Sequence, residues 1–196
     1  MLSLYYGDNE DEIQVGIDEA GKGCMIGPVY AAAVIWNNRD LDVSDIKDSK
    51  KISRKKRAVI REYIEKNATA YAVGSASREE IDEMNISNAT YLAMFRALDQ
   101  INVPFDRIVV DGNLFKPYKC NLHTCVVGGD NKYVSIAAAS ILAKEYHDDW
   151  ITQNFGDDTK YDLMNNKGYG TAKHMKGLEE HGLCDQHRRT YCKRFL

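Results

Sequence analysis

Short apolar runs that end in acidic residues constrain the fold of this chain more than any other feature. Alternating apolar residues at 13–17 predict a strand that leads directly into Asp18 and Glu19. The run RIVVD at 107–111 predicts a buried strand that again ends in an acid, Asp111. Three more runs, rich in small and β-branched residues, predict strands at 28–36, 69–75 and 124–127.

Helix signals lie between and after these strands. The alanine-rich stretch 133–154 predicts a long helix, and four residues are placed to cap others: Ser53 before a basic helix to Lys66, Ser77 in a capping box, Ser87 before a helix to Ile101, and Thr171 before a final helix that ends at Gly182. Neighbouring strands come first and then alternate with helices. This order predicts an α/β fold with a mixed central sheet flanked by helices.

Length and composition exclude several other classes of protein. The chain has 196 residues, 44% hydrophobic and 28% charged, which fits one folded domain and excludes disorder, collagen and coiled coil. The longest apolar run, 25–36, is too short to span a bilayer and contains Gly27 and Pro28. No signal peptide is recognisable, and five cysteines without C-x-x-C spacing indicate reduced thiols. We therefore expect a soluble cytoplasmic monomer with no membrane partner.

The charged residues are distributed unevenly along the chain. The net charge is only −3, but residues 47–66 carry nine basic and three acidic side chains, and residues 167–196 carry seven and three. The rest of the chain is acidic. These two basic segments are either solvated helix surfaces or the two sides of one groove for a phosphate backbone, and composition alone leaves both open.

The acids at the strand ends suggest a metal site. Asp18, Glu19 and Asp111 would meet at one edge of the sheet, where open α/β folds bind ligands. Lys144 and Asp148 lie four residues apart on one face of the long predicted helix, which can bring in a fourth carboxylate. Oxygen ligands without histidine or cysteine suit Mg²⁺ or Mn²⁺, and two such ions serve displacement at phosphorus. Unrelated surface or capping roles are the alternative for these acids.

Other common catalytic motifs are absent from the sequence. The segment GKGCMIG (21–27) approaches a dinucleotide fingerprint, but its glycine spacing is wrong and a strand follows where a helix should begin. The sequence contains no P-loop, no H-E-x-x-H and no G-x-S-x-G. These absences exclude the common nucleotide-hydrolase, zinc-protease and serine-hydrolase signatures.

Several longer motifs, in a fixed order across nearly the whole chain, resemble those of one enzyme family. They are GIDEAGKG (16–23) with GPVYAAAVI (27–35), DSKKIS (48–53), VDGN (110–113), GGDNKYVSIAAASILAK (128–144) with Asp148 after it, KGYGTAKH (167–174) and HRRTY (187–191). This set resembles ribonuclease HII, and its G-Y-G-T form and H-R-R tail are more similar to bacterial members than to archaeal or eukaryotic ones.

The resemblance implies an RNase H-like catalytic domain at 1–160 with a substrate-binding helical extension at 161–196. It implies an endonuclease that cleaves the RNA strand of RNA–DNA hybrids and nicks duplex DNA at single ribonucleotides, leaving 5′-phosphate and 3′-hydroxyl ends. Two divalent ions, Mg²⁺ or Mn²⁺, would take part. Carried over by motif, the metal-binding catalytic carboxylates are Asp18, Glu19, Asp111 and Asp148.

The resemblance also implies a set of substrate contacts. Gly21, Lys22 and Gly23 would contact the ribose 2′-hydroxyl, largely through their backbone, with Tyr169 against the sugar. This fits the physical expectation that glycine allows close backbone approach and that the 2′-hydroxyl distinguishes RNA from DNA. The residues implied to hold phosphates are Ser49, Lys50, Asn113 and Lys132.

The sequence departs from the family pattern at a few positions. Lys22 replaces a usual arginine, Cys24-Met25 replaces a pair that commonly contains proline, and Asn166 stands where bacterial relatives often have histidine. The tail CKRFL is not a clear clamp-binding motif. A nuclease for another structure, such as a DNA junction, and a catalytically silent hybrid-binding protein are the alternative functions. A missing acid would favour the silent protein, and none is missing.

Overall fold

The computed structural model describes residues 2–46, 52–119 and 122–196. Its five strands form one sheet in the order β3-β2-β1-β4-β5. The strands are β1 (Gln14–Ala20), β2 (Val29–Ile35), β3 (Ala70–Ala76), β4 (Arg107–Asp111) and β5 (Leu122–Val126). β1, β2 and β3 pair antiparallel, whereas β4 pairs parallel with both β1 and β5. The predicted mixed α/β sheet is confirmed.

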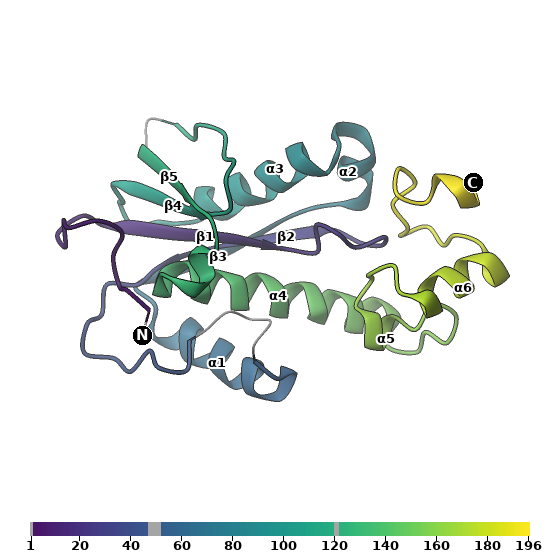
Figure 1. Ribbon diagram of the computed structural model, residues 1–196, viewed down its shortest axis with the longest axis horizontal. Helices are drawn as coiled ribbons and strands as arrows, with labels where there is room; N and C mark the ends of the chain where they lie inside the picture. Colours follow the sequence, from purple (N-terminus) through teal and green to yellow (C-terminus); the bar gives the residue numbers. More distant parts are fainter. Residues whose placement is uncertain (1, 47–51, 120–121) are drawn as a thin grey trace.

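The helices cover both faces of this sheet (Figure 1). They are α1 (Arg54–Asn67), α2 (Arg78–Met84), α3 (Ile86–Asp99), α4 (Val134–Phe155), α5 (Leu163–Asn166) and α6 (Ala172–His181), with short 3₁₀ turns at Gly129–Asn131 and Lys193–Phe195. In Figure 1, α2 and α3 lie above the sheet, α4 lies below it, and α1 packs beneath α4. α4 runs along the sheet towards α5 and α6.

Most of the predicted helix ends are confirmed. The Ser53 side chain caps α1, Ser77 forms a capping box with Glu80 at α2, Thr171 caps α6, and Gly182 ends α6 at φ 70°. The predicted cap at Ser87 is wrong. Asn85 caps α3 instead, at φ 71°, with its side chain accepting a hydrogen bond from the Asn88 amide. Asparagine is enriched among the few non-glycine residues with a positive φ, and it stands here at the one-residue link between α2 and α3.

The predicted first strand is too short. β1 continues to Ala20, so Asp18 and Glu19 lie within the strand rather than after it. Successive residues of β1 face opposite sides of the sheet. Val15 and Ile17 therefore pack into the core between the sheet and α3, whereas Gly16 and Asp18 face α4. Successive acids of the pair therefore point to opposite faces of the sheet.

A very close approach fixes α4 on β1. An added Cβ on Gly16 would lie 2.4 Å from the Ser135 carbonyl carbon and 2.6 Å from the Ile136 nitrogen. Backbone thus packs on backbone where the first turn of α4 crosses the strand. A second core of alanines and β-branched residues continues this contact between α4, the sheet and α1. The helix register relative to β1 is set at this point.

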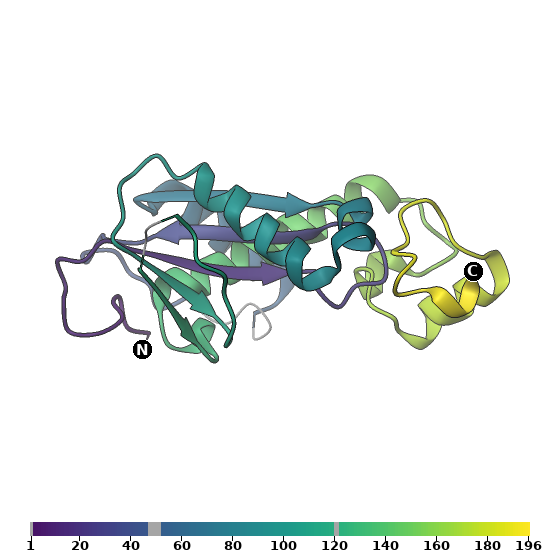
Figure 2. The same cartoon turned by 90° about the horizontal axis from the view of Figure 1, so that it is seen from above.

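The C-terminal segment packs at the far end of α4 (Figure 2). A smaller core joins Met25, Ile26 and Ile151 to Leu163 and Leu178. Isolated bridges also pair Cys24 with Tyr169 and Ile26 with His187. The loop after β1 is thereby enclosed by the segment that follows α4. The predicted division at residue 160 stays a prediction, and no helix in the described ranges is long and apolar enough to cross a membrane.

We predict that Gly16→Ala destabilises the protein, because the new methyl group would overlap the α4 backbone. Overpacking of this kind costs about 1–3 kcal/mol, which corresponds to a fall in Tm of roughly 2–12 °C. Gly23→Ala is the matched control, since its added Cβ would make only an ordinary contact at 3.5 Å. Thermal melting of both variants measures this. An unchanged Tm for Gly16→Ala would show that α4 does not depend on the contact.

Candidate active site

Asp18 and Asp111 are neighbours on the face of the sheet that α4 covers. Ile17 pairs with Val110 in the parallel ladder between β1 and β4, so the next residue of each strand is one of these aspartates. Val109, two residues before Asp111, packs against Ile136 of α4. Residues two apart on a strand share a face, so both carboxylates point towards α4.

This proximity perturbs the ionisation of Asp18, which is only 6% exposed. Burial raises the pKa of Asp18 well above its ordinary value, and the nearby charges of Glu19 and Asp111 raise it further. Hydrogen bonds from Ser140 and from the Glu19 amide oppose part of this shift. The Asp111 carboxylate accepts a hydrogen bond of 2.7 Å from the Gly129 amide. Burial and the nearby negative charge make ionisation of Asp18 unfavourable unless a cation is bound.

Glu19 points to the opposite face but reaches the same edge of the sheet. It lines a pocket of about 110 Å³ together with Lys22, Asp111 and Asn113. The Lys22 ammonium lies 3.4 Å from a Glu19 carboxylate oxygen. The structure thus brings together four residues that the sequence predicted for the site. The carboxylate and amide oxygens of Glu19, Asp111 and Asn113 are donors that fit Mg²⁺ or Mn²⁺. In the described ranges no three acidic, histidine or cysteine side chains are already grouped as ligands.

Asp148 lies farther along α4 and has other partners. It is eight residues beyond Ser140, which corresponds to about 12 Å along a helix. Its carboxylate forms ion pairs with Arg57 at 3.0 Å and with Lys144 at 2.8 Å. Burial raises the pKa of Asp148, but His147 and Lys144 outweigh this effect, and the net pKa is lowered. Its assignment as the fourth metal ligand stays a prediction.

Asp130 is a buried carboxylate that the sequence interpretation passed over. It follows Gly129, whose amide binds Asp111, and its side chain is 4% exposed and accepts a hydrogen bond of 2.8 Å from Asn131. β5 runs parallel to β4, so an acid just after β5 lies at the same edge of the sheet as Asp111. The argument that selected Asp111, an acid at the carboxyl end of a strand, therefore applies to Asp130 as well. Asp130 is therefore a second candidate for the fourth carboxylate.

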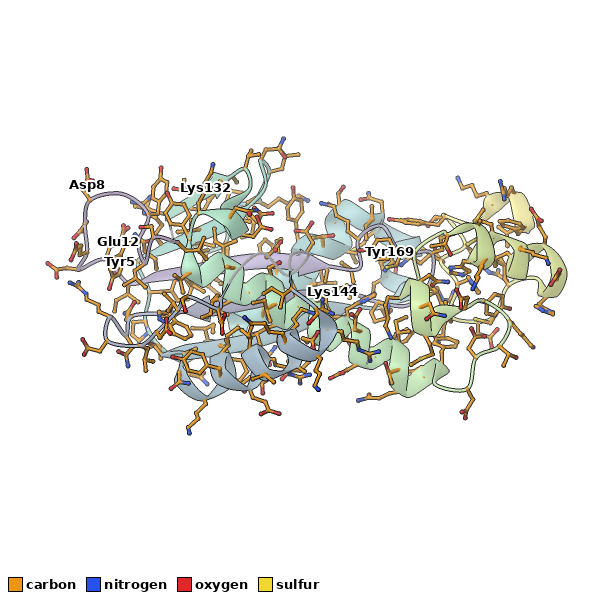
Figure 3. All side chains as sticks on the ribbon, turned by 60° about the horizontal axis from the view of Figure 1, so that its bottom comes forward. Tyr5, Asp8, Glu12, Lys132, Lys144 and Tyr169 are labelled. Atoms are coloured by element: carbon orange, nitrogen blue, oxygen red, sulfur yellow. The ribbon has the colours of Figure 1, made fainter. Side chains whose placement is uncertain are left out.

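The predicted ribose contacts form two facing surfaces next to these acids. Gly23 faces Tyr169: a Cβ added to Gly23 would lie 3.5 Å from the Tyr169 ring. The tyrosine is 43% exposed, and the Lys144 ammonium lies 5.5 Å from its ring centroid (Figure 3). Burial of one side of the ring raises the pKa of its hydroxyl to about 12, which keeps Tyr169 neutral.

The residues predicted to contact phosphates are not grouped in one place, in contrast to the predicted ribose contacts. Ser49 and Lys50 lie outside the described residues. Lys132 is exposed, and its ammonium donates to the Val127 carbonyl at 2.9 Å. Figure 3 shows Lys132 well away from Lys144 and Tyr169, towards the other end of the sheet. Asn113 is the predicted phosphate ligand that lines the pocket of Glu19 and Asp111.

Comparison with known families agrees with this geometry. The family model for Ribonuclease HII matches residues 15–194. The chain belongs to the ribonuclease HII family. It is 50% identical to ribonuclease HII of Bacteroides thetaiotaomicron over 183 residues, 93% of this chain and 91% of that one. Ribonuclease HII of Porphyromonas gingivalis is 44% identical over 191 residues, 97% and 94% of the two chains.

Solved structures show the same RNase H-like fold. Ribonuclease H2 from Pyrococcus horikoshii has a TM-score of 0.71 at 25% identity, covering 90% of this chain and 92% of that one. Ribonuclease HII from Archaeoglobus fulgidus, solved in complex with PCNA, has a TM-score of 0.69 at 27% identity over 90% and 93%. Members of the ribonuclease HII family are metal-dependent nucleases of the ribonuclease H type, and membership supports activity on RNA–DNA hybrids.

Two histidines to which the sequence analysis gave no role of their own form a buried pair beside the candidate site. His174 and His187 are fully buried, and their Nε2 atoms lie 3.0 Å apart. The Cys184 amide donates to His187 Nδ1, so a neutral His187 carries its hydrogen on Nε2 and donates it to His174 Nε2. His174 then carries its own hydrogen on Nδ1 and donates it to the Tyr169 carbonyl at 3.0 Å. This arrangement requires both rings to be neutral.

We predict that two of the acids expected to bind metal, Asp18 and Asp148, have opposite effects on the stability of the metal-free protein. Asp18→Asn should raise the free energy of unfolding by about 1 kcal/mol or more, because it removes crowded charge. Asp148→Asn should lower it by about 3 kcal/mol, since Arg57 loses part of its compensation. Thermal melting in EDTA measures both. A rise for Asp148→Asn would instead place that carboxylate in the crowded site.

Adding Mg²⁺ or Mn²⁺ to the same variants identifies the ligands without an activity assay. We expect the ions to raise the Tm of the wild type and to leave that of Asp18→Asn unchanged, because the ion would bind only the folded site. Asp130→Asn and Asp148→Asn are compared in the same titration. The variant that loses the ion-dependent rise in Tm carries the fourth ligand.

A further prediction concerns pH. Burial lowers the pKa of His187 to about 4, below the ordinary 6.5, so between these values only the unfolded chain is protonated there. Acid in this range therefore favours unfolding. We expect the stability advantage of the wild type over His187→Asn to be full at pH 7 and to shrink towards pH 4.5. Denaturant melts at several pH values measure it, and a constant difference would show that His187 is not held neutral.

Proposed function

We propose that this chain hydrolyses the RNA strand of RNA–DNA hybrids and also nicks duplex DNA at single ribonucleotides, by a mechanism that uses two divalent ions. The observation that supports this most directly is the placement of the Asp18 and Asp111 carboxylates at the same sheet edge as the Gly23–Tyr169 gap. An acidic centre for phosphate chemistry and a glycine-lined gap for a sugar would together select a phosphodiester next to a ribose.

The carboxylates would hold the ions. Asp18, Glu19 and Asp111 supply the common core, and Asp148, the predicted fourth ligand, or Asp130 would complete it. Divalent ions at such a site would supply a water of lowered pKa and stabilise negative charge at phosphorus. In the reaction, a water oxygen forms a bond to phosphorus while the bond to the 3′-oxygen breaks. The 3′-oxygen then gains a proton, which leaves a 3′-hydroxyl and a 5′-phosphate.

The ribose would be recognised between the G-K-G turn and Tyr169. Because Gly23 has no side chain, the backbone of the turn can come within hydrogen-bond distance of a 2′-hydroxyl. The half-exposed Tyr169 ring offers a flat apolar surface to the sugar. Lys22 has its ammonium directed to Glu19, which leaves its backbone as the group facing the substrate. The usual arginine at this position would then differ mainly in affinity.

A labelled duplex with one ribonucleotide tests the proposal. With Mg²⁺ or Mn²⁺ we expect cleavage of the phosphodiester on the 5′ side of the ribonucleotide, which leaves a 3′-hydroxyl and a 5′-phosphate. With a chelator we expect no cleavage. A catalytically silent protein would bind the duplex without cleaving it, and a junction nuclease would cleave a four-way junction in preference. Cleavage of hybrids but not of the single ribonucleotide would retain the family activity and contradict the finer proposal.

We predict that Tyr169→Ala impairs cleavage at a lone ribonucleotide more than cleavage within a long RNA tract. A lone 2′-hydroxyl offers one productive register, whereas a tract offers one at every step. Losing the ring contact should cost on the order of 1–3 kcal/mol, which corresponds to roughly tenfold to a hundredfold in kcat/KM. Steady-state kinetics on both substrates measure this selectivity.

Two matched variants control this experiment. Tyr169→Phe keeps the ring, so it should cost little if the sugar packs on the ring face. Gly23→Ala should reduce the selectivity from the opposite side of the gap, because its methyl group would project towards the ring with only ordinary contact in the free protein. Equal losses on both substrates with a lowered Tm would assign Tyr169 to core packing instead.

A further inference from the structure

Arg188 is a fully buried arginine whose donors all point at backbone carbonyls. It has 0% exposure and lies in the H-R-R motif near the end of the chain. Nε donates to Gly27 at 2.9 Å, Nη1 to Lys22 at 3.1 Å, and Nη2 to both Gly21 at 2.8 Å and Pro28 at 3.1 Å. A buried side chain in this position cannot reach a phosphate backbone.

These four carbonyls belong to the two ends of one loop. Gly21 and Lys22 begin the turn that follows β1, and Gly27 and Pro28 return the chain to β2. One planar guanidinium therefore ties the start of the loop to its end. The planar fork suits this task, because its five N–H groups lie in fixed directions and a lysine could satisfy fewer carbonyls.

Neighbouring contacts extend the same connection. The Tyr191 hydroxyl donates to the Lys22 carbonyl at 2.9 Å, so that oxygen accepts from two residues of the tail. The backbone of Arg188 donates to Met25 at 2.8 Å, and Gly27 donates to Gln186 at 2.9 Å. The tail thus runs beside the loop and is joined to it by backbone hydrogen bonds around the isolated Ile26–His187 bridge, in addition to the side-chain contacts.

The residue before Arg188 holds the opposite side of the ribose gap. His187 is linked through His174 to the Tyr169 carbonyl. Two consecutive residues of the tail therefore fix the two facing surfaces, the G-K-G turn through Arg188 and the Tyr169 backbone through His187. Displacement of either surface by about 1 Å would be felt strongly, because recognition sites need placement to within about 0.5 Å.

We propose that Arg188 is a positioning residue that sets the width of the gap between the G-K-G turn and Tyr169, and thereby the selectivity for single ribonucleotides. The inference rests on the proposed role of that gap in ribose recognition. It assigns to the C-terminal tail a role in specificity that acts through backbone carbonyls. The tail's basic composition had instead suggested contact with phosphates.

The test compares Arg188→Lys with Arg189→Lys as the matched control. Both variants keep the charge, but the Arg189 side chain is exposed and forms no hydrogen bond or ion pair with the described residues of the loop. Kinetics are measured on a duplex with one ribonucleotide and on a hybrid tract, below the Tm of every variant. Arg188→Lys should lower the ratio of kcat/KM for the first substrate to that for the second by about tenfold, as expected for one or two lost hydrogen bonds to a charged group. Arg189→Lys should leave the ratio unchanged.

Tyr191→Phe provides a second variant that removes a single hydrogen bond at the surface of the loop. It should shift the ratio in the same direction by about two- to fivefold, and it carries the test if Arg188→Lys does not fold. On the tract, kcat should fall while KM stays close to that of the wild type, because the tail would not contact the duplex phosphates.

The outcomes separate this inference from the proposed function. An unchanged ratio in both variants, with normal cleavage by the wild type, overturns the positioning role alone. An equal loss on both substrates with a flatter dependence of KM on salt also overturns it, since that result would make the tail a phosphate contact. Failure of the wild type to cleave at a single ribonucleotide overturns the proposed function and this inference with it.

Discussion

The contact between Gly16 of β1 and the first turn of α4 is the constraint on which the site depends. Because no Cβ separates the two backbones, α4 lies close against β1 and its register is fixed. Ser140 then comes opposite Asp18, and His147 comes so close to Gly21 that an added Cβ there would lie 2.5 Å from its ring. One strand and one helix, laid side by side at this spacing, thus place the acidic centre and the start of the ribose turn together.

Electrostatics divides the buried acids along α4 into two groups. At the sheet edge, Asp18 is buried among other carboxylates and is costly to ionise. A bound divalent ion would stabilise its charged form. Eight residues beyond Ser140, Asp148 lies between Arg57 and Lys144, which favour its charged form. An aspartate of β1 and an aspartate of α4, both buried beside the same helix, are therefore affected in opposite ways. Lys144, held by Asp148, in turn lies near the Tyr169 ring.

The sequence predicted the strands, the main helices and the approach of Asp18 to Asp111, because these follow from local periodicity and from the parallel order of strands. It could not show which long-range partner a buried polar side chain would find. In the sequence, Arg188 is one more charge in a basic segment and His174 is the last residue of a longer motif. In the structure both are buried, Arg188 against loop carbonyls and His174 against the ring of His187. Helical spacing in the sequence favoured Asp148 as the fourth carboxylate, so Asp130, the acid that follows β5, was missed.

The buried cations also change the meaning of the charge pattern. Residues 47–66 and 167–196 both carry excess positive charge in sequence, but Arg57, Lys167 and Arg188 are at most 8% exposed. Arg57 compensates internal carboxylates, and Arg188 binds carbonyls of the loop. The number of basic residues in these segments is therefore larger than the number available at the surface to contact phosphates. Part of the positive charge in these segments acts inside the protein, where it fixes the shape of the site. The remaining charge, at the surface, would attract a duplex to that site.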